Sequence, residues 1–522
     1  MKGREMPVIP LFKDNYAKGN WYVNSGHPAW SFSKQDGLVI EATDDEAMLR
    51  LEIPESGKAT VRQTTFMGDI VWGNPGVLYT VDEYNRIHGE TPLNATSLDL
   101  IPVAAHHALI IKIPAHSKLK VRKITSLALK DTLSAAVDHM LKRNLKGGIA
   151  VIVPSYPSEE NRYLCAFVHA RVKAYREAGV RCDVICAFDT YESHCTYSFE
   201  GVSVTRIPLS TLERALEVGR YKKALIHFFD DRYAPIVKSQ LTSHTDFLIW
   251  SHCPETMYWD WPVFATPYFQ EPATLNAGQI AEFEKRDELV KALNDQENVS
   301  WIFVSPFLKE RSEKLIGIRF RRSHIIPNVV DEKMFPFSEK DPDLRKRVFV
   351  ARKFDNVNTY SLDLVAQCII ELSKRPFFSD MEFSIFGEGN YFDELTAPIS
   401  DFPNVRIEQR FLSRQEIAEE HSKHGIALFP TRWDSQGVSM GEAAMSGLAV
   451  VSSSVEAAQL FLPNDCGLLA ENIEDPVEYA DIIEHLYRDP DYFLLCSKKC
   501  HEAAFNTARR ELTIRREIQL FR

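Results

Sequence analysis

Two short apolar runs in the C-terminal part of the chain constrain its fold more than any other feature. The runs, 426–429 and 448–451, have the length and composition of buried strands, and the segment between them has room for a loop and one short helix. We expect this helix to begin at Ser439, because Ser439 and Glu442 have the capping-box spacing, and to end at Gly447, a typical C-cap residue. Two strands joined through a helix are typical of a parallel α/β sheet.

The same alternation extends over most of the chain from residue 149 onward. Strands are expected at 149–153, 182–186, 224–229, 247–250 and 301–304, and again at 348–350, 382–386, 405–407, 426–429 and 448–451. Helices are expected at 162–178, 281–292, 361–373, 414–420 and 477–487. This alternation predicts two Rossmann-like lobes, each with a parallel, doubly wound sheet, joined by a linker at 331–345.

Residues 1–130 have a different periodicity. Short runs punctuated by Pro, Gly, Asn and Asp predict an all-β, sandwich-like domain, with strands at 37–41, 47–53, 59–64, 109–113 and 119–124. Its many aromatic residues either fill a small core or form a sugar-binding or oligomerising surface. The expected domains are 1–130 (β-rich accessory domain), 131–148 (helix and linker), 149–330 (first Rossmann-like lobe), 331–500 (second Rossmann-like lobe) and 501–522 (C-terminal helix).

The loop before the expected helix carries the candidate chemistry. A helix N-terminus presents N–H groups that have no partner within the helix, and Gly437 lies just in front of it, so this point suits an anion. Asp434 and Glu442 flank the same point, eight positions apart. A diphosphate held by the amides, with sugar hydroxyls bound by the carboxylates, predicts a nucleotide-sugar site. The alternatives are that Glu442 only caps its helix and that Asp434 is an ordinary loop residue.

The segment from Asp434 to Glu442, followed by Ala-Ala-Met-Ser-Gly, resembles the E-x7-E signature of the family 4 retaining glycosyltransferases, although its first residue is Asp rather than Glu. The resemblance implies the GT-B fold, with an acceptor lobe at 149–330 and a donor lobe at 331–500. It also implies that the basic amphipathic stretch 509–522 is a helix crossing back to the first lobe, the alternative being attachment to an anionic membrane surface. The resemblance does not cover residues 1–130.

The family's functional residues can be carried onto matching positions. Arg352, which follows the run 348–350, resembles the arginine that binds the donor diphosphate, and a guanidinium at the end of a parallel strand suits that role. A lysine that the family has five residues later is replaced here by Val357. The resemblance implies catalytic roles for His252, Asp434 and Glu442, and donor-binding roles for Arg352, Lys353, Gly387, Gly389, Gln436, Gly437, Val438 and Ser439. His227 is a second histidine candidate.

Composition and missing motifs exclude several function classes. The net charge of −11 disfavours nucleic-acid binding. The nine cysteines lack zinc-site spacing and indicate reduced thiols, and no run is long enough for a transmembrane helix, so we expect a cytoplasmic protein whose only membrane contact is peripheral, at the inner face. The Asp-x-Asp pairs at 341–343 and 489–491 lie in Pro-containing linkers or helix starts, so no metal site is expected. No dinucleotide-binding, Walker or nucleophile-elbow motif is present.

The sequence therefore predicts a retaining, metal-independent glycosyltransferase of hexosyltransferase type. It would move a sugar from a nucleotide-sugar to a glycan, lipid-linked or protein acceptor in polysaccharide or cell-surface glycan biosynthesis, with no cofactor besides the donor. The family mechanism implies that the leaving diphosphate assists attack on the same face, steadied by Arg352 and the amides after Gly437. Homo-oligomerisation through the β-rich domain is a further expectation. The alternative is a non-catalytic nucleotide-sugar- or glycan-binding relative, in view of Asp434 and the missing lysine.

Overall fold

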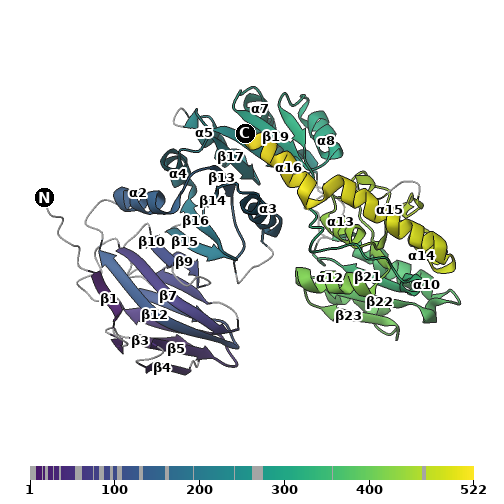
Figure 1. The fold of residues 1–522 in the computed structure, drawn as a ribbon, viewed down its shortest axis with the longest axis horizontal. Helices are drawn as coiled ribbons and strands as arrows, with labels where there is room; N and C mark the ends of the chain where they lie inside the picture. Colours follow the sequence, from purple (N-terminus) through teal and green to yellow (C-terminus); the bar gives the residue numbers. More distant parts are fainter. Residues whose placement is uncertain are drawn as a thin grey trace. The chain divides into compact units, whose positions relative to one another are not determined.

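The computed structural model divides the chain into two compact units, and Figure 1 shows their strands and helices coloured from purple at the N-terminus to yellow at the C-terminus. Unit 1 comprises residues 1–249 and 297–299, and unit 2 comprises residues 250–296 and 300–522. The structure describes residues 8–13, 16–17, 21–26, 29–33, 37–52, 62–73, 76–81, 87–93, 98–102, 108–128, 133–158, 164–191, 193–239, 242–260, 274–355, 357–460, 462 and 466–522. The strand expected at 59–64 lies partly outside them.

The first part of unit 1 consists of antiparallel strands, as the sequence predicts. Five of them have the order β3-β6-β11-β8-β9, and the long strands β7 and β12 pair with each other. Alternate residues such as Leu38 and Ile40, or Leu49 and Leu51, are fully buried, so the apolar faces of these strands share one core. The bounds are β1 Val8–Lys13, β2 Tyr16–Ala17, β3 Trp21–Ser25, β4 Ala29–Ser33, β5 Gly37–Ala42, β6 Ala47–Glu52, β7 Arg62–Trp72, β8 Val77–Val81, β9 Ile87–Pro92, β10 Leu98–Pro102, β11 Ala108–Ile113 and β12 Ser117–Ala128.

This β-rich region is continuous with the α/β part of unit 1. Strand β10 pairs with β7 on one side and with β15 (Ser193–Phe199) on the other, and β15 forms a hairpin with β16 (Val202–Pro208). The expected linker is also fixed, because the amides of Lys146 and Gly147 donate to one carboxylate oxygen of Asp183 at 2.7 and 2.8 Å. The expected boundary near residue 130 therefore does not interrupt the sheet.

The parallel part of unit 1 has the strand order β16-β14-β13-β17-β18. Every residue of β13 is buried, which is typical of a parallel strand covered on both faces. The bounds are α2 Leu133–Asn144, β13 Ile149–Val153, α3 Ala166–Glu177, β14 Cys182–Phe188, α4 Leu212–Gly219, β17 Lys223–His227, α5 Ala234–Val237 and β18 Asp246–Ser251. The apolar runs predicted these parallel strands to within a few residues, whereas the β15–β16 hairpin was not predicted.

Unit 2 contains a six-stranded parallel sheet of order β23-β22-β21-β24-β25-β26. The chain builds outward from β21 through β22 to β23 and then returns to place β24 on the other side of β21, so the direction of building reverses between β21 and β24. Ligands of doubly wound sheets bind outside the carboxyl ends of the strands at such a switch point. The bounds are β21 Arg347–Ala351, β22 Glu382–Gly387, β23 Val405–Gln409, β24 Ile426–Phe429, β25 Ala449–Ser453 and β26 Leu469–Ala470.

The helices of unit 2 agree with the apolar periodicity. Among the packed pairs, α10 contacts α14 and α13 contacts α15, and these four helices share one large apolar core with the six-stranded sheet. The bounds are α7 Ala277–Asn294, α8 Pro306–Ile316, α9 Val357–Tyr360, α10 Leu362–Ser373, α11 Phe392–Thr396, α12 Arg414–Lys423, α13 Val438–Met445, α14 Pro476–Arg488, α15 Pro490–Ala508 and α16 Arg510–Phe521, with β19 Val299–Phe303 beside β20 Ser323–Ile325.

The C-terminal helix α16 begins at a fixed point of unit 2. The amide of Val330 donates to the carbonyl of Ala508 at 2.9 Å, and the carboxylate of Glu332 accepts the amide of Arg510 at 2.7 Å. These contacts hold the bend between α15 and α16. Within the described part of the chain, no helix combines the length and the apolar character needed to span a membrane.

Candidate functional site

Arg352 follows directly after β21, at the switch point of the unit 2 sheet. Its residue surface is 9% exposed, and its guanidinium lies between two rings, 4.4 Å from the ring centre of Phe429 and 4.9 Å from that of Tyr360. Nη1 donates to the hydroxyl of Ser439 at 2.6 Å, whereas Nε and Nη2 have no partner in the described residues. Burial lowers the pKa of Arg352.

This arrangement leaves a buried cation without an anion. Buried charges in proteins are normally paired, and an unpaired buried donor carries a desolvation penalty. Tyr360 and then the carboxylate of Asp434 raise the pKa of the guanidinium, but in the described residues Asp434 makes no hydrogen bond to Arg352. An anionic ligand with two acceptor oxygens would satisfy both free N–H positions.

Helix α13 begins beside this guanidinium. Gly437 is its N-cap residue, with φ 75°, and no side chain caps the helix. The expected capping box is therefore wrong: Ser439 lies inside the helix and its hydroxyl accepts from Arg352. The main-chain amides at the start of α13 are consequently not taken by a side-chain cap and suit an anion. The end of the helix agrees with the prediction, since Gly447 has φ 82° and its amide donates to Ala444.

The loop residues before α13 have different partners. Asp434 accepts the amide of Gln436 at 3.2 Å, which shapes the turn that leads to Gly437. The side chain of Gln436 is fully buried and bonds to the backbone of Asn328, with its Nε2 donating to the carbonyl at 3.0 Å and its Oε1 accepting the amide. Gln436 thus ties the loop to the segment before residue 330.

Glu442 lies in the second turn of α13, not in its first turn. Its side chain is 13% exposed, and its Oε1 accepts from Arg414 Nη2 at 3.0 Å. Burial raises the pKa of Glu442, the charge of Arg414 lowers it, and that of Asp331 raises it. A role as a helix cap is excluded, because the side chain faces α12 instead of the start of its own helix.

Gly387 and Gly389 pack against the chain itself. A Cβ at Gly387 would lie 2.0 Å from the carbonyl oxygen of Arg352, and one at Gly389 would lie 2.5 Å from the carbonyl carbon of Phe354. Both glycines have large positive φ angles, 157° and 149°. The glycine turn is therefore required by the segment after β21. Lys353, in that segment, pairs with Asp355 at 3.1 Å and its side chain is 54% exposed.

His252 follows β18 and is 8% exposed. Its amide and that of Cys253 donate to the same carboxylate oxygen of Glu255, at 2.8 and 2.9 Å, while the other oxygen of Glu255 is buried without a partner in the described residues. Burial raises the pKa of Glu255 to about 7. Burial, then Glu255, then Asp434 raise the pKa of the Cys253 thiol, so the turn after β18 lies within electrostatic reach of the Asp434 loop.

Two predicted residues remain, Val438 and His227. Val438 is the first residue of α13, and His227 is the fully buried last residue of β17. Sequence reasoning missed Tyr360, Phe429, Arg414 and Glu255. Phe429 ends an expected strand, and Arg414 lies between Ser413 and Glu416, which form a visible capping box. Neither position indicates a contact with Arg352 or Glu442, because both contacts join residues far apart in the sequence.

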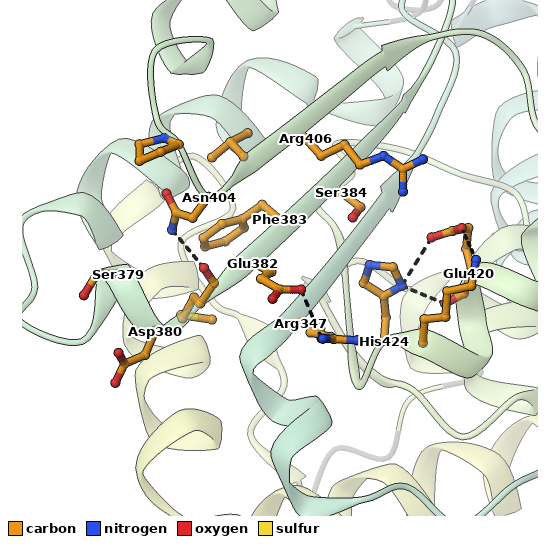
Figure 2. Close-up of a pocket in the computed structure, with 14 residues that line it drawn as sticks. Arg347, Ser379, Asp380, Glu382, Phe383, Ser384, Asn404, Arg406, Glu420 and His424 are labelled. Carbon is orange, nitrogen blue, oxygen red and sulfur yellow. Dashed lines mark hydrogen bonds and ion pairs between the residues drawn. The ribbon is translucent and has the colours of Figure 1, made fainter.

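A cavity of about 520 Å³ lies at the opposite, amino-terminal edge of the same sheet (Figure 2). Its walls include the ion pair of Arg347 and Glu382, 3.0 Å apart, and His424, whose Nδ1 lies 2.7 Å from the carbonyl of Glu420. None of the predicted site residues lines this cavity, so we place the candidate site at the switch point. In the portion of the chain that is described, no group of three or more His, Cys, Asp or Glu could hold a metal ion.

The comparisons with known proteins cover the part of the chain that carries the candidate site. Residues 345–489 match the family model described as glycosyl transferases group 1, and this range contains Arg352 and α13. The search of curated proteins found no match. Among solved structures, sucrose-phosphate synthase from Thermosynechococcus elongatus has a TM-score of 0.52 at 15% identity, covering 72% of this chain and 98% of that one.

Two further structures are similar in fold. The Anabaena HepE protein, in complex with UDP and glucose, has a TM-score of 0.51 at 11% identity, covering 72% of this chain and 99% of that one. The pneumococcal O-GlcNAc transferase GtfA, in complex with UDP and GlcNAc, has a TM-score of 0.50 at 10% identity, covering 72% and 98%. The matched domain and these neighbours together support a glycosyltransferase of the GT-B fold.

Proposed function

We propose that this protein transfers a sugar from a uridine-diphosphate sugar to a glycan or glycan-bearing acceptor, with retention of the anomeric configuration. One observation carries the proposal: in the described part of the chain, two nitrogens of the buried Arg352 guanidinium have no partner, and its third nitrogen binds Ser439 at the start of α13, which no described side chain caps. A cation and open amides on neighbouring elements suit a diphosphate. The UDP bound by HepE and GtfA makes uridine diphosphate the first nucleotide to test.

In the proposed mechanism, Arg352 and the first amides of α13 bind the diphosphate leaving group. As the bond between the anomeric carbon and the diphosphate oxygen breaks, negative charge grows on that oxygen, and groups already in place stabilise it. The acceptor hydroxyl attacks on the same face and passes its proton to the departing diphosphate. Asp434 and His252 are proposed to contact the donor sugar, and Glu442 the ribose. Since Arg352 and the amides meet the diphosphate charge, turnover should need no divalent metal.

The second candidate is a relative that binds the nucleotide-sugar or glycan without turning it over. It is favoured by the absence of the family lysine: this chain has Val357 at that position, and the valine is buried, with 1% of its surface exposed. Lys353 is a poor replacement in its present pairing with Asp355. With one cation fewer at the diphosphate, binding can persist while the leaving group is stabilised less.

A two-stage experiment distinguishes the candidates. A panel of nucleotide-sugars is first screened for thermal stabilisation of the full chain, and the hits are then assayed for release of free nucleoside diphosphate, with and without acceptor glycans. Stabilisation with release supports the transferase, and NMR of the product's anomeric proton then tests retention. Stabilisation without release under any acceptor condition supports the non-catalytic relative. No stabilisation by any nucleotide-sugar would contradict the transferase and the nucleotide-sugar-binding relative, and a screen of glycans under the same conditions then tests the glycan-binding relative.

The cellular setting is also a proposal. We place the reaction in polysaccharide or cell-surface glycan synthesis at the cytoplasmic side, with the acceptor bound by the first lobe, residues 149–330. We also propose a peripheral membrane contact, which fractionation of cells expressing the full chain tests. A homo-oligomer formed through the β-rich domain is tested by light scattering of the purified protein.

A further inference from the structure

Arg414 is held in a fixed position at the start of α12. The preceding residue, Ser413, caps the helix by accepting the amide of Glu416 at 3.2 Å, and Glu416 returns the bond by accepting the amide of Ser413 at 2.7 Å. The guanidinium of Arg414 lies 5.4 Å from the ring centre of Phe335. A capping box and a ring contact therefore define where this long side chain points.

The Arg414 guanidinium reaches only one of the two oxygens of Glu442. Its Nη2 donates to Oε1 at 3.0 Å, and the described residues provide no hydrogen bond to Oε2. A second bridge joins the same two helices, because the ring Nδ1 of His421 lies 2.9 Å from the hydroxyl of Ser446, which donates to the carbonyl of Glu442 at 3.2 Å. Helix α12 thus fixes α13 at the carboxylate and again one turn later.

We propose that Arg414 is a positioning residue for the donor nucleotide: its ion pair fixes one oxygen of Glu442 so that the other is presented to the vicinal hydroxyls of the ribose. The inference rests on the proposed function. A carboxylate oxygen that faces a vicinal diol accepts two hydrogen bonds, so its orientation decides whether both form. Without a cation nearby, a carboxyl group that is mostly buried and close to Asp331 takes up a proton more readily.

The proposal predicts a pH-dependent loss of ribose recognition. In Arg414→Gln, the remaining influences on Glu442 are burial and the charge of Asp331, and both raise its pKa. The variant should therefore bind UDP about tenfold or more weakly near neutral pH, recover part of this loss as the pH rises and Glu442 ionises, and keep kcat near the wild-type value. Arg414→Lys, which keeps the charge, should bind UDP with less dependence on pH than Arg414→Gln.

The experiment is a calorimetric titration of the full chain with UDP and with 2′,3′-dideoxy-UDP between about pH 6 and pH 9. The two nucleotides differ only in the ribose hydroxyls that Glu442 is proposed to bind. Wild type should prefer UDP, and Arg414→Gln should lose most of this preference. Arg406→Gln is the matched control, because Arg406 pairs with Glu408 on an edge strand and has no contact with Glu442. A melting curve of each variant accompanies the titrations.

Each possible outcome either supports or overturns the inference. Loss of the UDP preference in Arg414→Gln, but not in Arg406→Gln, supports the inference. Binding of UDP with the same preference and pH profile in both variants overturns it and leaves the proposed function standing. If Arg414→Gln does not fold, Arg414→Met, which also removes the charge, takes its place, and an unchanged preference and pH profile there overturns the inference. Failure of wild type to bind UDP overturns the UDP-donor proposal, and this inference with it.

Discussion

Replacing Arg352 by Met tests whether its buried guanidinium exists for a ligand or for the fold. Nε and Nη2 are buried and have no partner among the residues that the structure describes, and each such donor costs about 1–3 kcal/mol. The substitution removes this cost. It also removes the stabilising hydrogen bond to Ser439, worth about 1.5–3 kcal/mol, and the two ring contacts, worth about 1–3 kcal/mol together. Because these effects nearly cancel, the free energy of unfolding should change by less than about 2 kcal/mol.

The same substitution should act strongly on nucleotide binding. Two charge-assisted hydrogen bonds of about 1.5–3 kcal/mol each are lost in the complex, so the affinity for UDP should fall by at least about a hundredfold. Denaturant unfolding measures the stability of the free variant, and calorimetry measures its affinity for UDP. The shift in melting temperature that UDP produces in wild type should disappear.

Arg432→Met provides the contrast. Arg432 lies in the loop between β24 and α13, and its guanidinium is paired with the carboxylates of Asp363 at 2.8 Å and Glu474 at 2.6 Å. Its removal leaves the buried Asp363 unpaired, so we expect a loss of stability of about 3 kcal/mol with normal UDP affinity. If Arg352→Met behaves in this way instead, with a large loss of stability and unchanged UDP affinity, then Arg352 is structural and the reasoning is refuted.

Three further predictions follow from the described geometry. Burial raises the pKa of Glu255 from 4.5 to about 7, so wild type should lose stability as the pH rises between these values. The stability of Glu255→Gln relative to wild type should therefore increase by roughly 3 kcal/mol from about pH 5 to pH 8. Parallel denaturation profiles of the two proteins would contradict this. Steady-state kinetics should show that Glu442→Gln mainly raises the donor KM and Asp434→Asn mainly lowers kcat, each by about ten- to a hundredfold, and normal kinetics in both variants would move the site elsewhere. Turnover should persist in excess chelator, whereas full inactivation that manganese or magnesium restores would show a metal requirement.

The sequence predicted the parallel sheets because buried parallel strands are continuous apolar runs. The runs 149–153 and 426–429 coincide with β13 and β24, and the position of Arg352 after β21 follows from the same pattern. The β15–β16 hairpin was not predicted, because β15 carries polar residues such as His194 and Thr196, which are buried where β15 pairs with β10. That pairing depends on residues almost a hundred positions apart, so no local pattern indicates it.

The start of α13 shows where two local signals compete. The spacing of Ser439 and Glu442 favours a capping box, while Gly437 favours a left-handed residue at the N-cap. The competition is settled by tertiary contacts: Arg352 takes the hydroxyl of Ser439, and Arg414 takes the carboxylate of Glu442. Both arginines are distant in sequence from α13. The carboxylates of the site could thus be named from the sequence, but their partners could not.

Arg352 and the start of α13 are proposed to hold a nucleoside diphosphate. A calorimetric series, in which wild type is titrated with UDP, UMP and uridine under identical conditions, tests this proposal. UDP should bind tightest, and uridine at least about a hundredfold more weakly, because the diphosphate supplies the charge-assisted hydrogen bonds. Equal affinities for UDP and uridine, or no binding of UDP, would contradict it.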